Sequence, residues 1–331
     1  MIDRLRRMMR YALIVTLLLS ASCTGTLPFY DSAQHATGFI SVAPNVRLQY
    51  LDFGGSGEYM VFLAGAGDSA YVFTDFAPRF TNMFHVIAIT RRGFGESSQP
   101  SSGYDTATLA EDVHNALETL EITRADFVGH SFAGDELTRL AINHPEQVDK
   151  LVYLDAAYDL VDMRGDLNAT MIPAAPPPKV SDLASPAAVA AYVARTNGLT
   201  AFPEVEIRAT NVFDSDGKYL RPVTPPEISQ ALVNGEEHPD YVKLQAPALA
   251  IYTVPDVVTD WLPWLSTSSA NWGNASTLFP SVQASLQRQR DKFRNAVANG
   301  TIIEMHGTPH FLFIYDTDKV ENYIRSFLSA P

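Results

Sequence analysis

The feature that most constrains the fold is a serine on a tight turn between a predicted strand and a predicted helix. Residues 129–134 read GHSFAG, with an apolar stretch before them at 125–128 and a helical pattern after them at 136–141. Small residues suit such a turn, because the strand and helix backbones nearly touch there. The layout is that of a nucleophile elbow, although its fifth position is Ala133, where glycine is usual. It predicts that the hydroxyl of Ser131 projects from a sheet into a cleft.

Short apolar stretches alternate with helical patterns on both sides of this turn. The predicted strands cover 39–42, 46–52, 60–63, 85–89, 125–128, 150–154, 248–253 and 301–305. Helical spacing of apolar residues appears over 108–120, near 282–297 and over 318–328. Continuous apolar strands separated by helices pack as a parallel sheet that is covered on both faces. We therefore predict an α/β fold with a mostly parallel, eight-stranded sheet.

The alternation breaks between residues 157 and 245, where ten of the 21 prolines of the chain occur. The helical segments there are short, such as 186–195. Because proline ends helices and is excluded from central strands, this region does not continue the sheet. We expect an inserted, mainly helical unit at 157–245, within a core made of 38–156 and 246–331.

Composition excludes some classes of function. The chain has 331 residues and a formal net charge of −13, and no basic run follows residue 10. Such a protein does not attract nucleic acid through a basic field. No Lys-Ser or Lys-Thr pair follows Gly67, as a phosphate loop would need, and the H-E-x-x-H zinc pattern is absent from the sequence. We expect no metal and no cofactor.

The first residues resemble an export signal. Four arginines precede an apolar run at 11–19, and small residues follow at 20–22. The only cysteine, Cys23, comes next, and residues 19–23 (LSASC) resemble a bacterial lipobox in which Ser20 replaces an aliphatic residue. We expect a signal peptide at 1–22, a linker at 23–37, and export as a periplasmic, extracellular or membrane-anchored protein. Lipidation of Cys23 would anchor it, and plain secretion is the alternative.

A serine hydroxyl is a weak nucleophile and needs a base within hydrogen-bond reach. His310 is the predicted base, because it lies on a loop between the last predicted strand and the last predicted helix. His306 is a nearby competitor on the same loop. No metal is needed for this chemistry.

The base in turn needs an acid that orients it. Asp256 is the preferred candidate, because it follows the predicted strand 248–253. Asp155, at the end of the strand 150–154, is the alternative acid, and Asp260 is a weaker third. The chain order serine, acid, histidine holds with either of the first two.

Negative charge that develops on a substrate oxygen needs backbone N–H donors, an oxyanion hole. Phe132 should provide one donor, at the start of the helix that follows the serine. The loop 63–68 (LAGAGD) after a predicted strand should provide the other, and Ala66 is the best-placed residue.

Taken together, these motifs resemble the α/β-hydrolase family of the serine esterase type over about residues 39–330. Residues 90–97 (TRRGFGES) resemble the family stretch D-x-R-G-x-G-x-S, with Thr90 in place of Asp. The family's His-Gly before the oxyanion donor appears as Ala64-Gly65. The stretch 307–313 resembles the family's histidine turn. Ser131 disfavours the relatives with an aspartate nucleophile, the dehalogenases and epoxide hydrolases.

The resemblance implies that 157–245 forms a cap over the site, and its acidic and aromatic composition favours a small, neutral or apolar acyl substrate. We expect a serine hydrolase that cleaves a carboxylic ester or lactone through an acyl-enzyme. One alternative is an aminopeptidase-like amide hydrolase, with Glu204 or Glu206 binding a substrate amine. The other is a ligand-binding or receptor protein whose triad is poorly active.

Overall fold

The computed structural model describes residues 35–166 and 172–329. The predicted signal peptide, Cys23 and most of the predicted linker lie outside these residues. Every helix within them is too short or too polar to cross a lipid bilayer.

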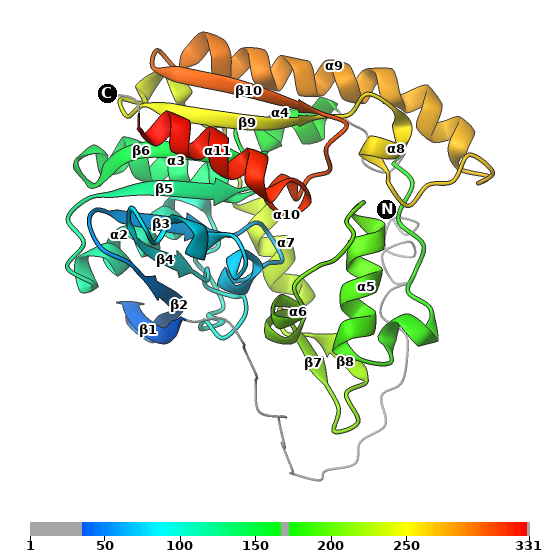
Figure 1. Cartoon of the computed structure of the whole chain (residues 1–331), viewed down its shortest axis with the longest axis horizontal. Coiled ribbons are helices and arrows are strands. Elements are labelled where there is room, and N and C mark those ends of the chain that lie inside the picture. The colour runs from blue at the N-terminus through cyan, green and yellow to red at the C-terminus, as the bar shows by residue number, and fades with distance from the viewer. Residues whose placement is uncertain (1–34, 167–171, 330–331) are drawn as a thin grey trace.

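Eight strands form one sheet at the centre of the protein, in the order β1-β2-β4-β3-β5-β6-β9-β10 (Figure 1). The strands are β1 (Ala36–Ala43), β2 (Val46–Gly54), β3 (Tyr59–Leu63), β4 (His85–Ile89), β5 (Ala125–His130), β6 (Val148–Leu154), β9 (Ala248–Val254) and β10 (Gly300–His306). The pairs β1–β2 and β2–β4 are antiparallel, and the other pairs are parallel. The predicted fold class is therefore confirmed, with β1 beginning inside the predicted linker.

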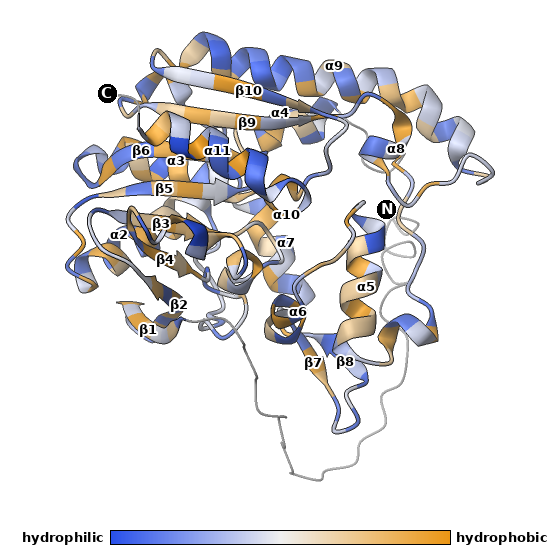
Figure 2. Ribbon diagram, viewed as in Figure 1, coloured by the Kyte–Doolittle hydropathy of each residue, from blue (hydrophilic) through white to orange (hydrophobic). Residues whose placement is uncertain are grey.

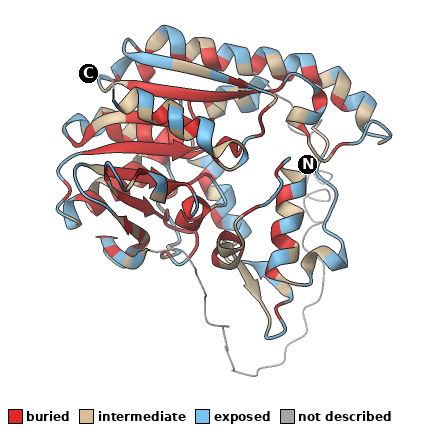
Figure 3. Ribbon diagram, in the orientation of Figure 1, coloured by how far each residue is buried: buried red, intermediate tan, exposed pale blue. Residues whose placement is uncertain are grey.

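The two faces of the sheet carry separate hydrophobic clusters. Met60 and Phe62 of β3 belong to one cluster, and Val61 and Leu63 belong to the other, as the alternation of side chains along a strand requires. Every residue of β5 is buried, and the central strands form the buried interior in Figure 3. The same strands are largely hydrophobic in Figure 2, whereas the covering helices alternate hydrophobic and polar residues.

Helices cover both faces. The helices on one face are α2 (Thr106–Thr119), α3 (Ala133–Asn143) and α9 (Trp272–Ala296). The other face is covered by the short 3-10 helices η2 (Ala70–Phe73) and η3 (Ala77–Phe80), then α10 (Leu312–Tyr315) and α11 (Thr317–Leu328). Asp105 caps α2 by accepting a hydrogen bond from the Thr108 amide at 2.9 Å.

The region between β6 and β9 is mainly helical, as a cap would be. It contains α4 (Leu160–Asp166), α5 (Pro186–Thr196), α6 (Glu204–Thr210), the antiparallel pair β7 (Asn211–Phe213) and β8 (Tyr219–Pro222), and α7 (Pro226–Asn234). Side chains of α5 and α6, including Val189 and Ile207, join the hydrophobic cluster on one face of the sheet. The elements α5, α6, β7 and β8 lie together to one side of the sheet (Figure 1).

Candidate active site

Ser131 occupies the junction between β5 and α3, where the backbone is strained. Its φ of +55° lies in the left-handed region, which costs a residue other than glycine on the order of 1–3 kcal/mol. The neighbouring strand holds it in place, because the Ser131 amide donates to the Leu154 carbonyl at 3.1 Å. A strained serine between a strand and a helix is the geometry of a nucleophile elbow.

The glycine requirement of this turn falls on Gly134. A Cβ atom there would lie 1.8 Å from the carbonyl oxygen of Ala156, so no other residue fits without moving the backbone. Ala133, one position earlier, is fully buried and carries its methyl group inside the core. The sequence therefore departs from the usual elbow pattern by one residue. The position that must be glycine, because the helix backbone meets Ala156 there, is 134 instead of 133.

The ring of His310 is bonded to Asp155. His310 lies between β10 and α10, and its Nδ1 is 2.6 Å from Oδ2 of Asp155, the residue that follows β6. Asp155 also accepts hydrogen bonds from the amide and hydroxyl of Thr253, at 2.9 and 2.8 Å, and from the hydroxyl of Tyr158. The carboxylate is buried and its orientation is fixed by these donors, so it can hold the imidazole ring in one position.

The pKa shifts of this pair have opposite signs. Burial works to raise the pKa of Asp155, but the hydrogen bonds and the His310 ring outweigh it, and the pKa falls below its ordinary value. Burial works to lower the pKa of His310, but the hydrogen bond and charge of Asp155, helped by Asp68, raise it. A carboxylate that stays ionised and a more basic imidazole are what a general base needs.

The structure does not bring Asp256 to His310. Oδ1 of Asp256 lies 2.8 Å from Nδ1 of His306, and both side chains are more than half exposed. The parallel register explains this pairing, because Val254 at the end of β9 is opposite His306 at the end of β10. The next residue, Gly307, has a φ of +61° and bends the chain away from this pair. Of the two predicted acids, Asp155 rather than Asp256 therefore contacts His310.

The two other weaker candidates also lie apart from the His310 ring. Asp260 accepts the amides of Asp256 and Val257, at 2.9 and 3.0 Å, before the short helix α8 (Val258–Trp261). The ring of His306 contacts Asp256 instead. Asp260 lies within α8 and is half-buried, and His306 is the exposed last residue of β10.

A second histidine, His130, directly precedes Ser131 and lies against His310. The ring of His130 is 4.5 Å from the His310 ring between centroids, and its Nε2 donates to the His310 carbonyl oxygen at 3.2 Å. Burial lowers the pKa of His130 to about 3, so the ring is neutral. Within the described residues, no hydrogen bond joins the Ser131 hydroxyl to the His310 ring. Such catalytic hydrogen bonds often tighten only when substrate binds.

The loop after β3 lies against the serine turn. A Cβ atom on Gly65 would be 3.1 Å from the Cβ of Ser131, and Ala66 follows in an exposed position. The buried guanidinium of Arg91 fixes this loop by donating to the carbonyl oxygens of Gly65 and Ala64, at 3.0 and 2.8 Å. Phe132, the other predicted donor, directly precedes α3.

Sequence reasoning missed what fixes this loop. Arg91 also pairs with Glu136, in the first turn of α3, and both side chains are almost completely buried. The pair therefore connects the loop to the helix that follows Ser131. The available signals were Glu136, an acidic residue at the start of the predicted helix, and Arg91, the first of two arginines in TRRGFGES.

A carboxyl group of the predicted cap also reaches this loop. Glu206 of α6 is buried, and its carboxyl oxygens accept hydrogen bonds from the Ser69 amide at 2.9 Å and hydroxyl at 2.5 Å. Burial raises the pKa of Glu206 well above its ordinary value, and the nearby Asp68 adds to this. Burial also raises the pKa of Asp68 to about 7, against the opposing charges of His310 and Arg91. Glu204 instead pairs with Arg208 on the same helix.

A pocket of about 620 Å³ is lined by residues of this loop and of the predicted cap. Gly67 and Asp68 line it on one side, Phe202 and Glu206 line it on the other, and Phe311, the residue after His310, also borders it. Its size suits a small organic ligand. No lysine or arginine is among the described residues that line it. Two groups of side chains in the described part of the chain are close enough together to hold a metal ion. Neither group contains Ser131, His310 or Asp155.

Part of the chain is similar in sequence to known hydrolases. A family model of the α/β hydrolase fold matches residues 59–195. A 2-(acetamidomethylene)succinate hydrolase from Mesorhizobium japonicum is 33% identical over 101 residues, which cover 30% of this chain and 36% of that protein. A soluble epoxide hydrolase from Corynebacterium sp. is 31% identical over 115 residues, which cover 35% of this chain and 40% of that protein. The matched segment thus spans well under half of each relative.

Solved structures match over most of the chain. The crystal structure of E-2-(acetamidomethylene)succinate hydrolase covers 90% of this chain with a TM-score of 0.65 and 21% identity, and all of that chain is matched. Carboxylesterase CesB from Bacillus subtilis covers 90% of this chain, with 93% of its own length matched, a TM-score of 0.61 and 14% identity. At such identities the likeness concerns the fold.

Proposed function

Because the chain belongs to the α/β-hydrolase fold family, we propose that it is a serine hydrolase that cleaves a carboxylic ester or lactone. The triad is Ser131, His310 and Asp155. The observation that carries this proposal is the 2.6 Å contact between His310 and a buried aspartate, beside a serine on a strained turn. Structural roles alone do not require a strained serine next to an oriented imidazole.

The reaction follows from the chemistry of these groups. The Ser131 oxygen attacks the carbonyl carbon while His310 takes its proton, and Asp155 holds Nδ1–H and stabilises the imidazolium that forms. The amides of Phe132 and Ala66 stabilise the negative charge on the carbonyl oxygen. His310 then gives the proton to the leaving alcohol. Water, deprotonated by the same ring, releases the acyl group from the serine.

The pocket supports a neutral or apolar acyl group. Phe202, Ile207 and Phe311 provide apolar surface, whereas the ionisable groups among the described lining residues are the acids Asp68 and Glu206. Because no lysine or arginine is among the described lining residues, a substrate carboxylate finds no charge partner among them. We therefore expect this chain to differ in substrate from a relative whose name specifies a succinate.

An amide hydrolase acting on an amine-bearing substrate is the second candidate. The observation in its favour is Asp68, a pocket acid that can pair with a cation. The carboxyl group of Glu206 is less suitable, because Ser69 already donates two hydrogen bonds to it. The non-enzymatic alternative is a ligand-binding or receptor protein whose triad is poorly active.

One set of measurements separates these functions. The full chain is tested with p-nitrophenyl esters of increasing acyl length, with amino-acid p-nitroanilides, and with a fluorophosphonate probe that labels activated serines. We expect ester turnover and labelling, both lost in Ser131→Ala and kept in Ser101→Ala, an exposed serine outside the turn. Faster anilide than ester turnover would favour the amide hydrolase. Full activity in Ser131→Ala would refute the mechanism.

Export remains a separate proposal. We propose that residues 1–22 direct the chain out of the cytoplasm and that Cys23 receives a lipid. All of these positions lie outside the described residues. Incorporation of a clickable palmitate analogue and recovery in the membrane fraction should both disappear in Cys23→Ala. Release of unlabelled parent protein would instead indicate plain secretion.

A further inference from the structure

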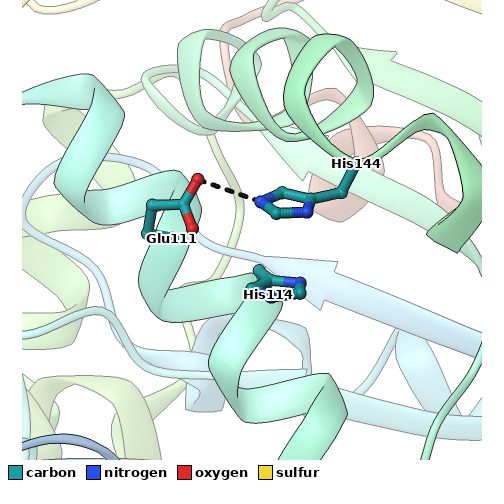
Figure 4. Close-up of side chains that lie close together, drawn as sticks. All are labelled: Glu111, His114 and His144. Carbon is teal, nitrogen blue, oxygen red and sulfur yellow. Dashed lines mark hydrogen bonds and ion pairs between the residues drawn. The ribbon is translucent and has the colours of Figure 1, made fainter.

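Three side chains on the face of the sheet covered by α2 and α3 gather outside the site described above. Glu111 and His114 lie on α2, and His144 directly follows α3, and each offers a ligand atom within 4.8 Å of the others (Figure 4). Nε2 of His144 is 2.9 Å from Oε1 of Glu111. The two imidazole rings are stacked, with 3.7 Å between centroids and 6° between planes. All three residues are partly exposed, so an ion can reach them from solvent.

Hydrogen bonding fixes which nitrogen of His114 is free. Nδ1 of His114 is 2.9 Å from Oε1 of Gln147, whose Nε2 donates to Glu118 at 2.9 Å. A carboxylate only accepts hydrogen bonds, so the amide nitrogen faces Glu118 and the amide oxygen faces the ring. Nδ1 therefore carries the proton, and Nε2 of the neutral ring keeps its lone pair. Zinc-binding histidines have this arrangement, with the second nitrogen donating to an oxygen behind the ring. Gln147 is buried, so the arrangement is rigid.

We propose that Glu111, His114 and His144 bind one zinc ion that links α2 to the end of α3. Two imidazole nitrogens and one carboxylate oxygen are a common zinc donor set, with water as the fourth ligand. Tetrahedral zinc places neighbouring ligand atoms about 3.3 Å apart. His144 and Glu111 are already close enough. The His144 ring must turn about χ2, because parallel rings do not aim their lone pairs at one point and Gln147 holds the His114 ring.

The protons of this binding step balance. In the metal-free site the short contact between His144 and Glu111 is made by the proton on Nε2, which a carboxylate accepts. Zinc takes that position, and the proton moves to Nδ1, which lies 3.7 Å from Oε1 of Glu146. No oxidant or co-reactant is needed.

A second group of possible ligands provides an internal control. Asp159, Asp162 and His238 also lie close together, but the ammonium group of Lys292 contacts both carboxylates. The lysine already supplies the positive charge that a metal would bring. We expect no zinc at this second group.

The proposed ion is remote from the reacting serine. Helix α3 begins two residues after Ser131 and runs for 11 residues to Asn143, a length of about 16 Å. Zinc there should stabilise the contact between α2 and α3 without entering catalysis. The proposal is therefore independent of the proposed hydrolase function.

The test uses the full chain without a histidine tag, stripped with a chelator and titrated with zinc by calorimetry and by thermal unfolding. We expect one zinc per chain and a rise in Tm. His114→Ala and His144→Ala should weaken binding at least about tenfold, and Gln147→Leu about 10- to 100-fold by releasing the His114 ring. His238→Ala should bind as the parent does.

Cobalt gives a readout that a purely structural cluster would not produce. Binding of Co²⁺ should generate the intense visible bands of a tetrahedral site, lost in His114→Ala. Melting curves in chelator check that each variant is folded, and if His114→Ala is unstable, Gln147→Leu serves in its place. Equal zinc affinity in the parent and in both histidine variants would overturn the proposal, as would a parent that binds no zinc.

Discussion

Asp155 is the residue whose surroundings say most about the chemistry. Its backbone has a φ of +48°, a strained value, and its buried carboxylate receives donors from Thr253 and Tyr158 as well as from His310. A buried carboxylate would be costly unless several donors satisfied it. These donors fix the orientation of the Asp155 carboxylate. Its Oδ2 therefore accepts the hydrogen bond from Nδ1–H of His310, and Nε2 of that ring points away from the aspartate.

We predict that Asp155→Asn lowers kcat by about 10⁴-fold, the loss that follows when an amide stabilises the wrong imidazole tautomer. Asp256→Asn should change kcat less than about twofold, because its partner is His306. Steady-state kinetics with one p-nitrophenyl ester compare the two, and circular dichroism checks that both are folded. Larger loss in the Asp256 variant would return the acid role to that residue.

The pH profile gives a second prediction at this scale. His310 must be neutral to accept a proton, and its pKa is raised by Asp155 against the effect of burial. The acid limb of kcat/KM should therefore lie above the ordinary histidine pKa of about 6.5. Activity falls as the pH drops through it. In Asp155→Asn the limb should move to lower pH, and an unmoved limb would show that another group titrates.

The sequence singled out Ser131 and His310 from their local setting, but it did not indicate which aspartate contacts His310. A nucleophile turn has a local signal, since Gly134 must approach Ala156. The acid depends on strand register. Both Asp155 and Asp256 follow strands at the same edge, and the pairing of Val254 with His306 places Asp256 beside His306 rather than His310. No periodicity in one sequence contains that information.

At the scale of elements, the pair Arg91–Glu136 joins the loop after β3 to α3. Arg91→Met leaves the buried Glu136 carboxylate without its ion-pair partner. It also removes the hydrogen-bond donor of two carbonyl oxygens in the loop. We predict a loss of about 3–5 kcal/mol in the free energy of unfolding. The double variant Arg91→Met/Glu136→Leu should lose clearly less than the two single variants added together. Urea unfolding of all four proteins measures this coupling, and strict additivity would contradict it.

The contact between α6 and the same loop has its own consequence. Glu206→Ala removes both acceptors of Ser69 and should lower kcat/KM about 30-fold, corresponding to about 2 kcal/mol for a buried donor left unsatisfied. Glu206→Gln should stay within about threefold, because the raised pKa of Glu206 already favours its neutral form. Glu204→Ala, on the same helix but paired with Arg208, is the matched control. Equal losses in the Ala and Gln variants would mean that charge, rather than the two acceptors, matters.

Element boundaries show where propensity failed. Helix α9 begins at Trp272, before the predicted start near 282, although Pro280 lies within it. Proline normally ends a helix. Here the first turns pack Ala275 and Phe279 into a separate cluster with the helix α8. The strands β7 and β8 were also missed, because three or four residues are too few for a period to emerge.

For the whole molecule, the alternation of strands and helices was enough to predict one sheet covered on both faces. The pocket was not predictable in this way, because its walls come from the loop after β3, the predicted cap and Phe311. Their meeting places two carboxyl groups, Asp68 and Glu206, beside apolar surface. The electrostatic character of the pocket is therefore a property of the assembled fold.

That character gives a prediction about substrate charge. Burial raises the pKa of Asp68 to about 7, so the pocket gains negative charge as the pH rises through that value. We predict that kcat/KM for p-nitrophenyl hemisuccinate, relative to neutral p-nitrophenyl butyrate, falls about fivefold between pH 6 and pH 8. Protonation of His310 affects both esters and cancels in the ratio. Asp68→Asn should make the ratio independent of pH, whereas Asp216→Asn, on an exposed turn, should leave the fall intact. A fall that persists in Asp68→Asn would assign the titration to another group of the pocket.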